Sequence, residues 1–191
     1  MNNLRITGIL GFRSLWIDGI PQSGGLYNKI WKKVLHQLES RTLNNILMLG
    51  LGGGTAAKHL LREHPQAHIT AVEINPEVVG IAKRHFLSLR ELGKLNIVTE
   101  DAKIWVKKDT AVYDLIVVDL YLQNHNPPFA RTKTFLKKIK NRLATKGCIV
   151  YNAAHPKDHE AEFTALYETC LSCFTVKTLH KGYEHHYLLL E

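Results

Sequence analysis

From Asn45 onward, short runs of apolar and β-branched residues alternate with segments whose apolar residues recur at helical spacing. This alternation constrains the fold strongly, because it is typical of a parallel sheet covered by helices on both faces. We predict five strands in βαβαβ order, followed by an antiparallel pair. The five strands are Ile46–Leu49, His68–Glu73, Leu95–Thr99, Tyr113–Asp119 and Cys148–Asn152, and the closing pair is Phe174–Leu179 and His186–Leu190. The fourth strand is apolar between its terminal acids, as expected for a central strand buried on both faces.

Helical patterns fill the gaps between these strands. The predicted helices are Ala56–His64, Pro76–Phe86, Ala102–Lys107, Lys133–Leu143 and Glu160–Leu171. Asn75 is a suitable N-cap for the second helix, since Pro76 then takes the first helical position. The expected fold class is α/β: a mostly parallel, twisted, Rossmann-like sheet with helices on both faces and an antiparallel C-terminal strand pair.

The first 40 residues predict a small cap on this core. Leu4–Leu10 and Ser14–Asp18 resemble a hairpin, Gly19–Gly25 reads as a loop, and an amphipathic helix follows. That helix carries Leu26, Ile30, Trp31, Val34, Leu35 and Leu38 on one face. We therefore expect one domain over residues 1–191, with the cap in 1–40 and the Rossmann-like core in 41–191.

The composition agrees with a globular protein. A chain of 191 residues is long enough to build a hydrophobic core without metals or disulfides. No apolar run approaches the roughly 18 residues of a membrane span, and the N-terminal stretch does not resemble a signal peptide. The 3 cysteines predict reduced thiols. These features favour a cytoplasmic protein that does not bind membranes.

Two other kinds of site have weaker support. Cys170 and Cys173 form a single C-x-x-C upstream of His180, His185 and His186, which would allow zinc, but packing at a helix end is the simpler explanation and we predict no metal. The basic run Arg131–Arg142 and the net charge of +8 would suit nucleic acid. The same helix has an apolar face, so its lysines can equally be the solvated side, and nucleic acid is not favoured.

The first strand runs directly into a turn with four glycines. They are Gly50, Gly52, Gly53 and Gly54, and a helix begins after them. Such a turn lets a ligand approach the backbone and offers the unpaired N–H groups of a helix start. Thr55 stands where the dinucleotide fingerprint G-x-G-x-x-G has its third glycine, which weakens the nicotinamide alternative.

Acidic residues end the next three strands. Glu73 can accept both hydroxyls of a ribose, Asp101 follows the third strand, and Asp119 lies where the strand order of such a sheet reverses. Three carboxylates behind a glycine turn favour a ligand with hydroxyls, an exocyclic amine and a positive charge. S-adenosylmethionine has all three.

On these residues the chain resembles class I S-adenosylmethionine-dependent methyltransferases, and most closely their spermidine-synthase-like branch. The stretches that carry the resemblance are LMLGLGGGTAAKHL, ITAVEINPEVVGIAKRHF, IVTEDAKIWV and YDLIVVDLY. The resemblance implies that the glycine turn holds the methionine part of the cofactor, Glu73 the ribose and Asp101 the adenine. The full set of expected cofactor-binding residues is Gly50, Gly52, Gly53, Gly54, Glu73, Ile74, Asp101, Ala102 and Asp119. S-adenosylhomocysteine would be the product.

The chain departs from the polyamine-making members of that family at two positions. Those enzymes carry an acid directly after the glycines and a D-x-x-D after the fourth strand; here Thr55 and Leu122 replace two of these acids, and Asp119 remains. A dicationic amine would lose hydration without a counter-charge at these positions. We therefore predict a methyltransferase, with aminopropyl transfer and a non-catalytic cofactor-binding module as alternatives.

The loop after the fourth strand would border the acceptor. Asp119 and His125 are the candidate catalytic residues, since His125 is a neutral-pH base within the loop. The expected substrate-pocket residues are Gln22, Tyr27, Tyr121, Asn126 and Pro127, with Tyr151, Asn152 and His155 as further candidates. The N-P-P-F sequence also invites comparison with enzymes that methylate amino groups of bases. The predicted partner is a small-molecule or protein methyl acceptor, and the resemblance implies a homodimer.

Overall fold

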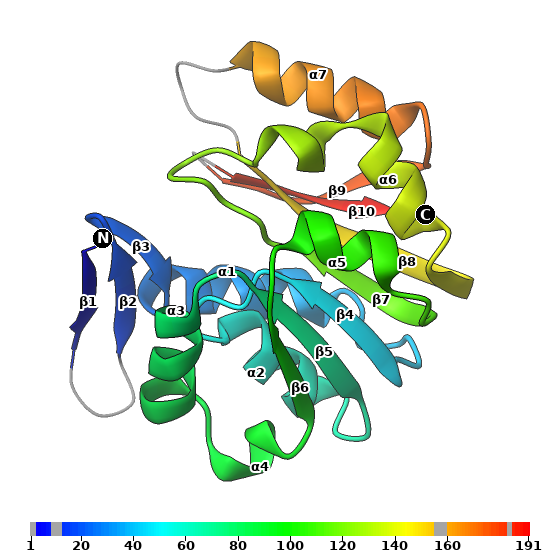
Figure 1. The fold of residues 1–191 in the computed structure, drawn as a ribbon. Coiled ribbons are helices and arrows are strands. Elements are labelled where there is room, and N and C mark those ends of the chain that lie inside the picture. Colours follow the sequence, from blue (N-terminus) through cyan, green and yellow to red (C-terminus); the bar gives the residue numbers. More distant parts are fainter. Residues whose placement is uncertain (1–2, 9–12, 155–159, 183–184) are drawn as a thin grey trace.

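The main sheet has seven strands in the order β6-β5-β4-β7-β8-β10-β9 (Figure 1). The computed structural model describes residues 3–8, 13–154, 160–182 and 185–191. The strands are β4 (Asn45–Leu49), β5 (His68–Glu73), β6 (Leu95–Thr99), β7 (Tyr113–Val118), β8 (Leu143–Ala154), β9 (Val176–Lys181) and β10 (His185–Leu190). Strands β4 to β8 pair in parallel, whereas β10 lies antiparallel between β8 and β9. The predicted α/β fold class is confirmed.

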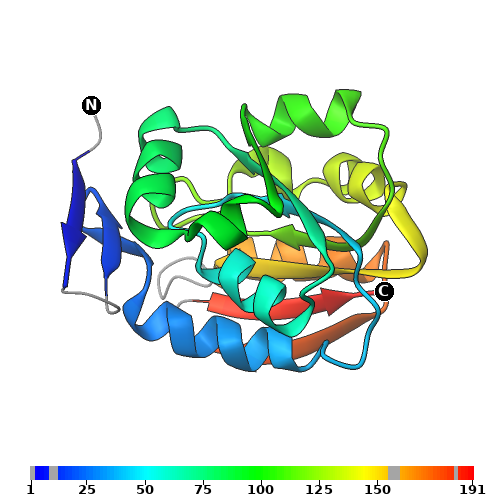
Figure 2. The ribbon, with the colours of Figure 1, turned by 90° about the horizontal axis from the view of Figure 1, so that it is seen from below.

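A second, smaller sheet of three strands lies at the N-terminus. Its strands are β1 (Leu4–Thr7), β2 (Ser14–Ile17) and β3 (Ile20–Ser23), and they pair antiparallel in that order. Figures 1 and 2 show this sheet at one end of the domain, close to the helix that follows β5. The prediction of a loop over Gly19–Gly25 is therefore wrong. Asp18 and Gly19 both have positive φ, as a two-residue hairpin turn requires, so the chain reverses there into β3.

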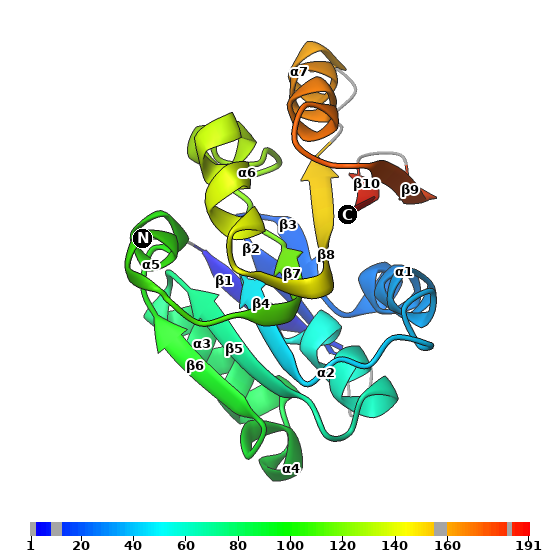
Figure 3. The ribbon, with the colours of Figure 1, turned by 90° about the vertical axis from the view of Figure 1, so that its right-hand side faces the viewer.

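Helices cover both faces of the main sheet. They are α1 (Gly25–His36), α2 (Thr55–Glu63), α3 (Pro76–Ile81), η1 (Ala82–Phe86), α4 (Leu89–Leu92), α5 (Ala102–Lys108), η2 (Pro128–Arg131), α6 (Lys133–Lys140) and α7 (Glu160–Leu171). Figure 3 shows α1 and α2 on one side of the sheet and α5, α6 and α7 on the other. Each side has its own cluster of buried apolar residues, so β4 and β7 are packed on both faces.

Local sequence signals set several helix ends. The Asn75 side chain accepts a hydrogen bond from the Glu77 amide at 2.9 Å, which confirms it as the N-cap of α3. The predicted helix Pro76–Phe86 is α3 continued by a π-helical turn, η1. The short helix α4 begins with a capping box formed by Ser88 and Glu91, a signal present in the sequence that our prediction did not include.

Three predicted boundaries on the C-terminal side are wrong. The helix predicted over Lys133–Leu143 ends at Lys140, and Leu143 already pairs with Tyr113. Strand β8 is therefore 12 residues long, and the predicted Cys148–Asn152 is only its centre. The strand predicted from Phe174 begins at Val176, after a turn closed by the Phe174 amide. The predicted end of the first strand at Leu10 lies outside the described residues. The remaining predicted boundaries differ by a residue or two, which is the usual ambiguity at element ends.

Candidate functional site

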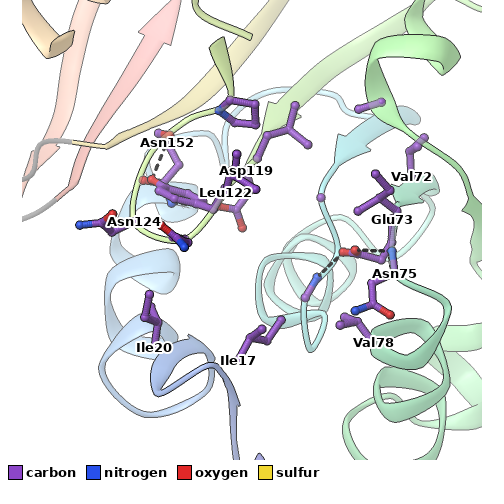
Figure 4. Close-up of a pocket in the computed structure, with 18 of the residues that line it drawn as sticks. Ile17, Ile20, Val72, Glu73, Asn75, Val78, Asp119, Leu122, Asn124 and Asn152 are labelled. Atoms are coloured by element: carbon purple, nitrogen blue, oxygen red, sulfur yellow. Dashed lines mark hydrogen bonds between the residues drawn. The ribbon is translucent and has the colours of Figure 1, made fainter. Parts of the chain in front are cut away.

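A cavity of about 560 Å³ opens where β4, β5, β6 and β7 end, between the main sheet and the N-terminal cap. Eleven predicted site residues line it: Tyr27, Gly50, Gly52, Glu73, Ile74, Asp101, Ala102, Asp119, Tyr121, Pro127 and Asn152. Figure 4 shows Glu73, Asn75 and Val78 on one side and Asp119, Leu122 and Asn152 on the other. We call the first side, formed after β5 and β6, the cofactor half, and the second side, formed after β7 with the cap, the acceptor half.

Gly50 joins the two halves. Its φ is +91°, and a Cβ there would lie 2.1 Å from the carbonyl oxygen of Asp119. Only glycine allows β4 and β7 to come so close at their ends. Gly50 thus lets the glycine turn and Asp119 face the same cavity.

Two of the four predicted glycines, Gly53 and Gly54, do not line the cavity. The Gly53 amide donates to Ser23 Oγ at 2.6 Å, and a Cβ at Gly54 would lie 2.8 Å from the Leu87 side chain. Neither glycine is among the lining residues. They pack the turn against β3 of the cap and against the segment after η1.

Glu73 holds the glycine turn in place. Its Oε2 accepts hydrogen bonds from the amides of Leu51 at 3.1 Å and Gly52 at 3.2 Å, and its Oε1 accepts from the Asn75 amide at 3.0 Å. Dashed lines in Figure 4 mark bonds of this carboxylate. The acid that ends β5 is therefore fixed by backbone donors at the edge of the cavity.

Asp101 is fixed in a similar way on the same side. Its Oδ1 accepts from the Lys103 amide at 2.7 Å, so the carboxylate is the N-cap of α5. Glu100, its neighbour in the chain, also lines the cavity and forms a salt bridge of 2.7 Å with Lys108. The strand end after β6 thus brings two carboxylates to the cofactor half.

Asp119 lies on the floor of the acceptor half. Its Oδ1 accepts a hydrogen bond of 2.8 Å from Asn152 Nδ2, which opposes the effect of burial. Burial and the nearby charge of Glu73 raise the pKa of Asp119 to about 6. A carboxyl with a pKa near neutrality can hold or release a proton under ordinary conditions.

A group of hydrogen-bonded side chains closes the acceptor half. His185 Nε2 lies 3.2 Å from the Tyr27 hydroxyl, and His185 Nδ1 lies 2.8 Å from the Tyr121 hydroxyl. Tyr121 also donates to the Asn152 carbonyl oxygen at 3.1 Å. His185 was considered from the sequence only as a zinc ligand, and Asn152 only as a neighbour of the acceptor. No local motif indicates this group, because its members come from α1, the loop after β7, β8 and β10.

The remaining predicted residues lie elsewhere. His125 is 3.4 Å from Glu162, on α7, and does not line the cavity, so its position gives no support to a catalytic role. Asn126 is 2% exposed and holds the loop to β8, donating to the carbonyl of Asn152 and accepting from the Ala154 amide. Two candidates cannot be placed: the Gln22 side chain and all of His155 lie outside the described residues.

The charge in the cavity is opposite to the charge of the chain. Five carboxylates line it, from Asp18, Glu73, Glu100, Asp101 and Asp119. Among the described lining residues there is no Lys or Arg, although the chain has a net charge of +8. The cavity is therefore suited to a ligand that carries positive charge.

Other kinds of site are not found in the part of the chain that the structure describes. Within residues 3–8, 13–154, 160–182 and 185–191, no group of three or more His, Cys, Asp or Glu side chains could hold a metal ion. Cys170 and Cys173 are free thiols, and Cys170 is a buried residue of α7. None of the described helices is long and apolar enough to cross a membrane.

Comparison with known families identifies the chain. The spermine/spermidine synthase domain matches residues 32–180. The chain belongs to this family. A polyamine aminopropyltransferase from Vibrio vulnificus is 32% identical over 122 residues, which are 61% of this chain and 40% of that protein. A Drosophila melanogaster protein named as an eEF1A lysine and N-terminal methyltransferase homolog is 33% identical over 118 residues, 56% of this chain and 17% of that protein. The chain thus spans less than half the length of these two relatives.

Solved structures of two kinds share the fold. Spermidine synthase from Thermotoga maritima superposes with a TM-score of 0.78 at 16% identity, covering 100% of this chain and 69% of that one. Human methyltransferase-like protein 13, solved with S-adenosylhomocysteine, gives a TM-score of 0.71 at 20% identity, covering 86% of this chain and 81% of that one. The same fold therefore occurs both in a protein named spermidine synthase and in a protein named methyltransferase-like.

Proposed function

We propose that this chain binds S-adenosylmethionine in the cavity and transfers its methyl group to an acceptor held beside Asp119. The carboxylates of the cavity, with no Lys or Arg among the described lining residues, support a cationic cofactor. The resemblance assigns the methionine part to the glycine turn, the ribose to Glu73 and the adenine to Asp101. All three elements face one cavity in this chain.

The observation that carries methyl transfer is the environment of Thr55. It follows the glycine turn, where polyamine-making relatives have an acid, and its Oγ1 accepts from the Gly24 amide at 3.2 Å. In those relatives the acid directly follows the turn to which the resemblance assigns the methionine part of the cofactor, and there it would repel the carboxylate of S-adenosylmethionine, which decarboxylated S-adenosylmethionine lacks. In this chain Thr55 is 9% exposed and does not line the cavity. Thr55 instead fastens the cap to the start of α2 and adds no negative charge. This arrangement supports the intact methyl donor over its decarboxylated form.

Leu122 supports the same preference on the acceptor side. It lies at the cavity and is 64% exposed, in the position where polyamine-making relatives have the second acid of D-x-x-D. A diamine would find only one of the two carboxylates there. The desolvation of its second ammonium would not be compensated by an opposite charge.

The chemistry requires little from the protein beyond alignment. When bound, S-adenosylmethionine supplies a methyl group already activated on a positively charged sulfur. The acceptor half has to orient the nucleophile in line and exclude water. Asp119 can accept the proton that the acceptor loses, since its pKa of about 6 suits proton transfer near neutrality.

Aminopropyl transfer is the second candidate. The names of the curated relatives and the retained Asp119 favour it. Incubating the protein with an equal mixture of S-adenosylmethionine and decarboxylated S-adenosylmethionine, and with pooled acceptors, separates the two. We expect S-adenosylhomocysteine, the product of methyl transfer. Formation of 5′-methylthioadenosine with an aminopropylated amine would instead show aminopropyl transfer and contradict the proposal.

A further inference from the structure

We propose that the outer surface of α1 and α2 binds nucleic acid through its phosphates, without regard to base sequence. Five exposed, positively charged side chains define this surface, which we call the basic face: Lys29, Lys32, Lys33, Lys58 and Arg62. None of them lines the cavity, so the inference goes beyond the proposed methyl transfer and does not depend on it.

The two helices form one continuous surface. They pack against each other on one side of the main sheet (Figure 3). His59 of α2 is 4% exposed, and its Nε2 lies 2.7 Å from Asn28 Oδ1 of α1. Its Nδ1 lies 2.6 Å from Arg62 Nη2, so Arg62 donates to Nδ1 and Nε2 donates to Asn28. This contact fixes the exposed side of α2 beside the exposed side of α1.

Positive charge gathers around this contact. Burial is the main cause that lowers the pKa of His59 to about 4, and the charges of Arg62, Lys32 and Lys58 lower it further. Side chains from both helices therefore lie close enough to one imidazole to act on its charge. The basic face is one cluster and not a set of scattered surface charges.

Acidic side chains do not neutralise this cluster. Helix α1 has no Asp or Glu, and it carries Lys29, Lys32 and Lys33 at spacings that place like charges side by side. The one acid of α2 is Glu63, whose carboxylate lies 3.7 Å from Arg62. In the described part of the chain, none of the four lysines of the basic face forms an ion pair. Strand β9, which α1 contacts, adds two more lysines and no acid. An anion that binds this face would relieve the repulsion.

The second basic region of the chain, Arg131–Arg142, has different surroundings. Arg131 pairs with Glu162 at 2.6 Å, and Lys140 donates to the carbonyl oxygen of Cys173. Helix α7, which packs against α6, carries three glutamates and no Lys or Arg. The lysines of α6 therefore lie next to an acidic helix, whereas the neighbours of the basic face are themselves basic.

The chemistry of the basic face favours phosphates over other anions. Lysine is depleted at the centres of protein–protein interfaces, and a helix that lies on a membrane exposes a broad apolar side. The apolar side of α1 is buried, and Leu26 is the one large apolar side chain exposed on α1 or α2, both of which are fully described. With 12 residues, α1 is about 18 Å long, a length over which a duplex carries roughly ten phosphates.

The test measures binding of the full chain to a fluorescein-labelled DNA duplex of about 20 base pairs by fluorescence anisotropy at several salt concentrations. If four or five side chains reach phosphates, the affinity should fall a few hundred-fold between about 50 and 200 mM salt. Replacing one lysine on each helix, Lys32→Gln with Lys58→Gln, should weaken binding at least about ten-fold and reduce the salt dependence by about two phosphate contacts. Both positions are exposed, so the variant should keep the melting temperature of the wild type.

The matched control is Lys133→Gln with Lys137→Gln on α6, which removes the same two charges at exposed positions on the other side of the sheet. We expect it to change the affinity less than about three-fold. No saturable binding of the duplex at low salt, or an equal loss in the control variant, would overturn the inference. Polyglutamate or vesicles of phosphatidylserine that displace the labelled duplex more effectively than unlabelled duplex would also contradict it, since the partner would then be an acidic polypeptide or a lipid surface.

Discussion

Replacing Asp119 with asparagine should stabilise the folded protein at neutral and alkaline pH. The pKa of Asp119 is raised from 3.8 to about 6, chiefly by burial, so the folded protein retains a proton that the unfolded chain has already lost. The contribution of this group to stability is complete below the unfolded pKa and is lost as the pH rises through about 6. Above that pH, the native protein keeps a carboxylate that disfavours folding. The asparagine side chain in Asp119→Asn would carry no such charge, and its amide oxygen can still accept from Asn152 Nδ2.

The magnitude follows from the size of the shift. About two pKa units correspond to roughly 3 kcal/mol at most, and solvent in the cavity reduces this to about 1–2 kcal/mol. For a chain of this size, such a change raises Tm by about 2–8 °C. The expected gain is present at pH 8 and absent at about pH 4, where Asp119 is protonated in the native protein.

Calorimetry of both proteins across this pH range measures the difference. Asp101→Asn is the matched control, because it makes the same charge change at an N-cap, where asparagine replaces aspartate with little loss. An Asp119→Asn protein that is less stable than wild type at pH 8, or equally stabilised at both pH values, would refute the reasoning. A stability gain accompanied by loss of transfer would mean that the carboxylate is kept for function.

Three further predictions concern other parts of the molecule. Glu73→Ala should weaken the binding of S-adenosylhomocysteine about ten- to a hundred-fold, as measured by calorimetry, because the variant loses a carboxylate that also orders the glycine turn. An unchanged affinity would contradict a role of Glu73 in binding. Asn126→Ala should lower the free energy of unfolding by about 2–3 kcal/mol in urea titrations, since it leaves buried partners unpaired; a change below about 0.5 kcal/mol would count against this. His59 is buried against Asn28 and Arg62, and burial is the main cause that lowers its pKa to about 4. Its contribution to the free energy of unfolding is therefore complete above pH 6.5 and is lost as the pH falls toward 4. His59→Gln should therefore flatten the acid side of the stability profile, and an unaltered profile would argue against this assignment.

The strand ends of the core could be predicted from the sequence because their signals are local. Strands β5 and β6 match the predicted bounds, since each is a short apolar run between clear turn residues. The cap of α3 follows from the order Asn75-Pro76 alone. The parallel topology then places the residues after each strand at one edge, so the positions of Glu73, Asp101 and Asp119 at one cavity could be expected.

The sequence contains a hairpin signal for β3 of the N-terminal sheet that our prediction did not use. Asp18-Gly19 is a strong hairpin dipeptide. Pro21 lies in this segment, and proline is rare in strands because it cannot donate a hydrogen bond to a neighbouring strand. Proline is tolerated there because β3 is the edge strand of its sheet.

The hydrogen-bonded group of Tyr27, Tyr121, Asn152 and His185 could not be predicted from local patterns. Tyr27 and His185 are separated by 158 residues in the sequence, and their contact depends on β10 inserting between β8 and β9. His125 illustrates the opposite case. Its position in a polar loop beside Asp119 suggested catalysis, but the tertiary structure places it next to Glu162.

Comparing the affinities of the protein for the two possible donors tests the central claim most directly. Wild-type protein is titrated by calorimetry with S-adenosylmethionine and, separately, with decarboxylated S-adenosylmethionine, and Thr55→Asp restores the acid that the polyamine-making relatives carry. We predict that wild type prefers S-adenosylmethionine and that Thr55→Asp shifts the preference toward the decarboxylated form. Tighter binding of decarboxylated S-adenosylmethionine by the wild type, or no binding of either donor, would contradict the account.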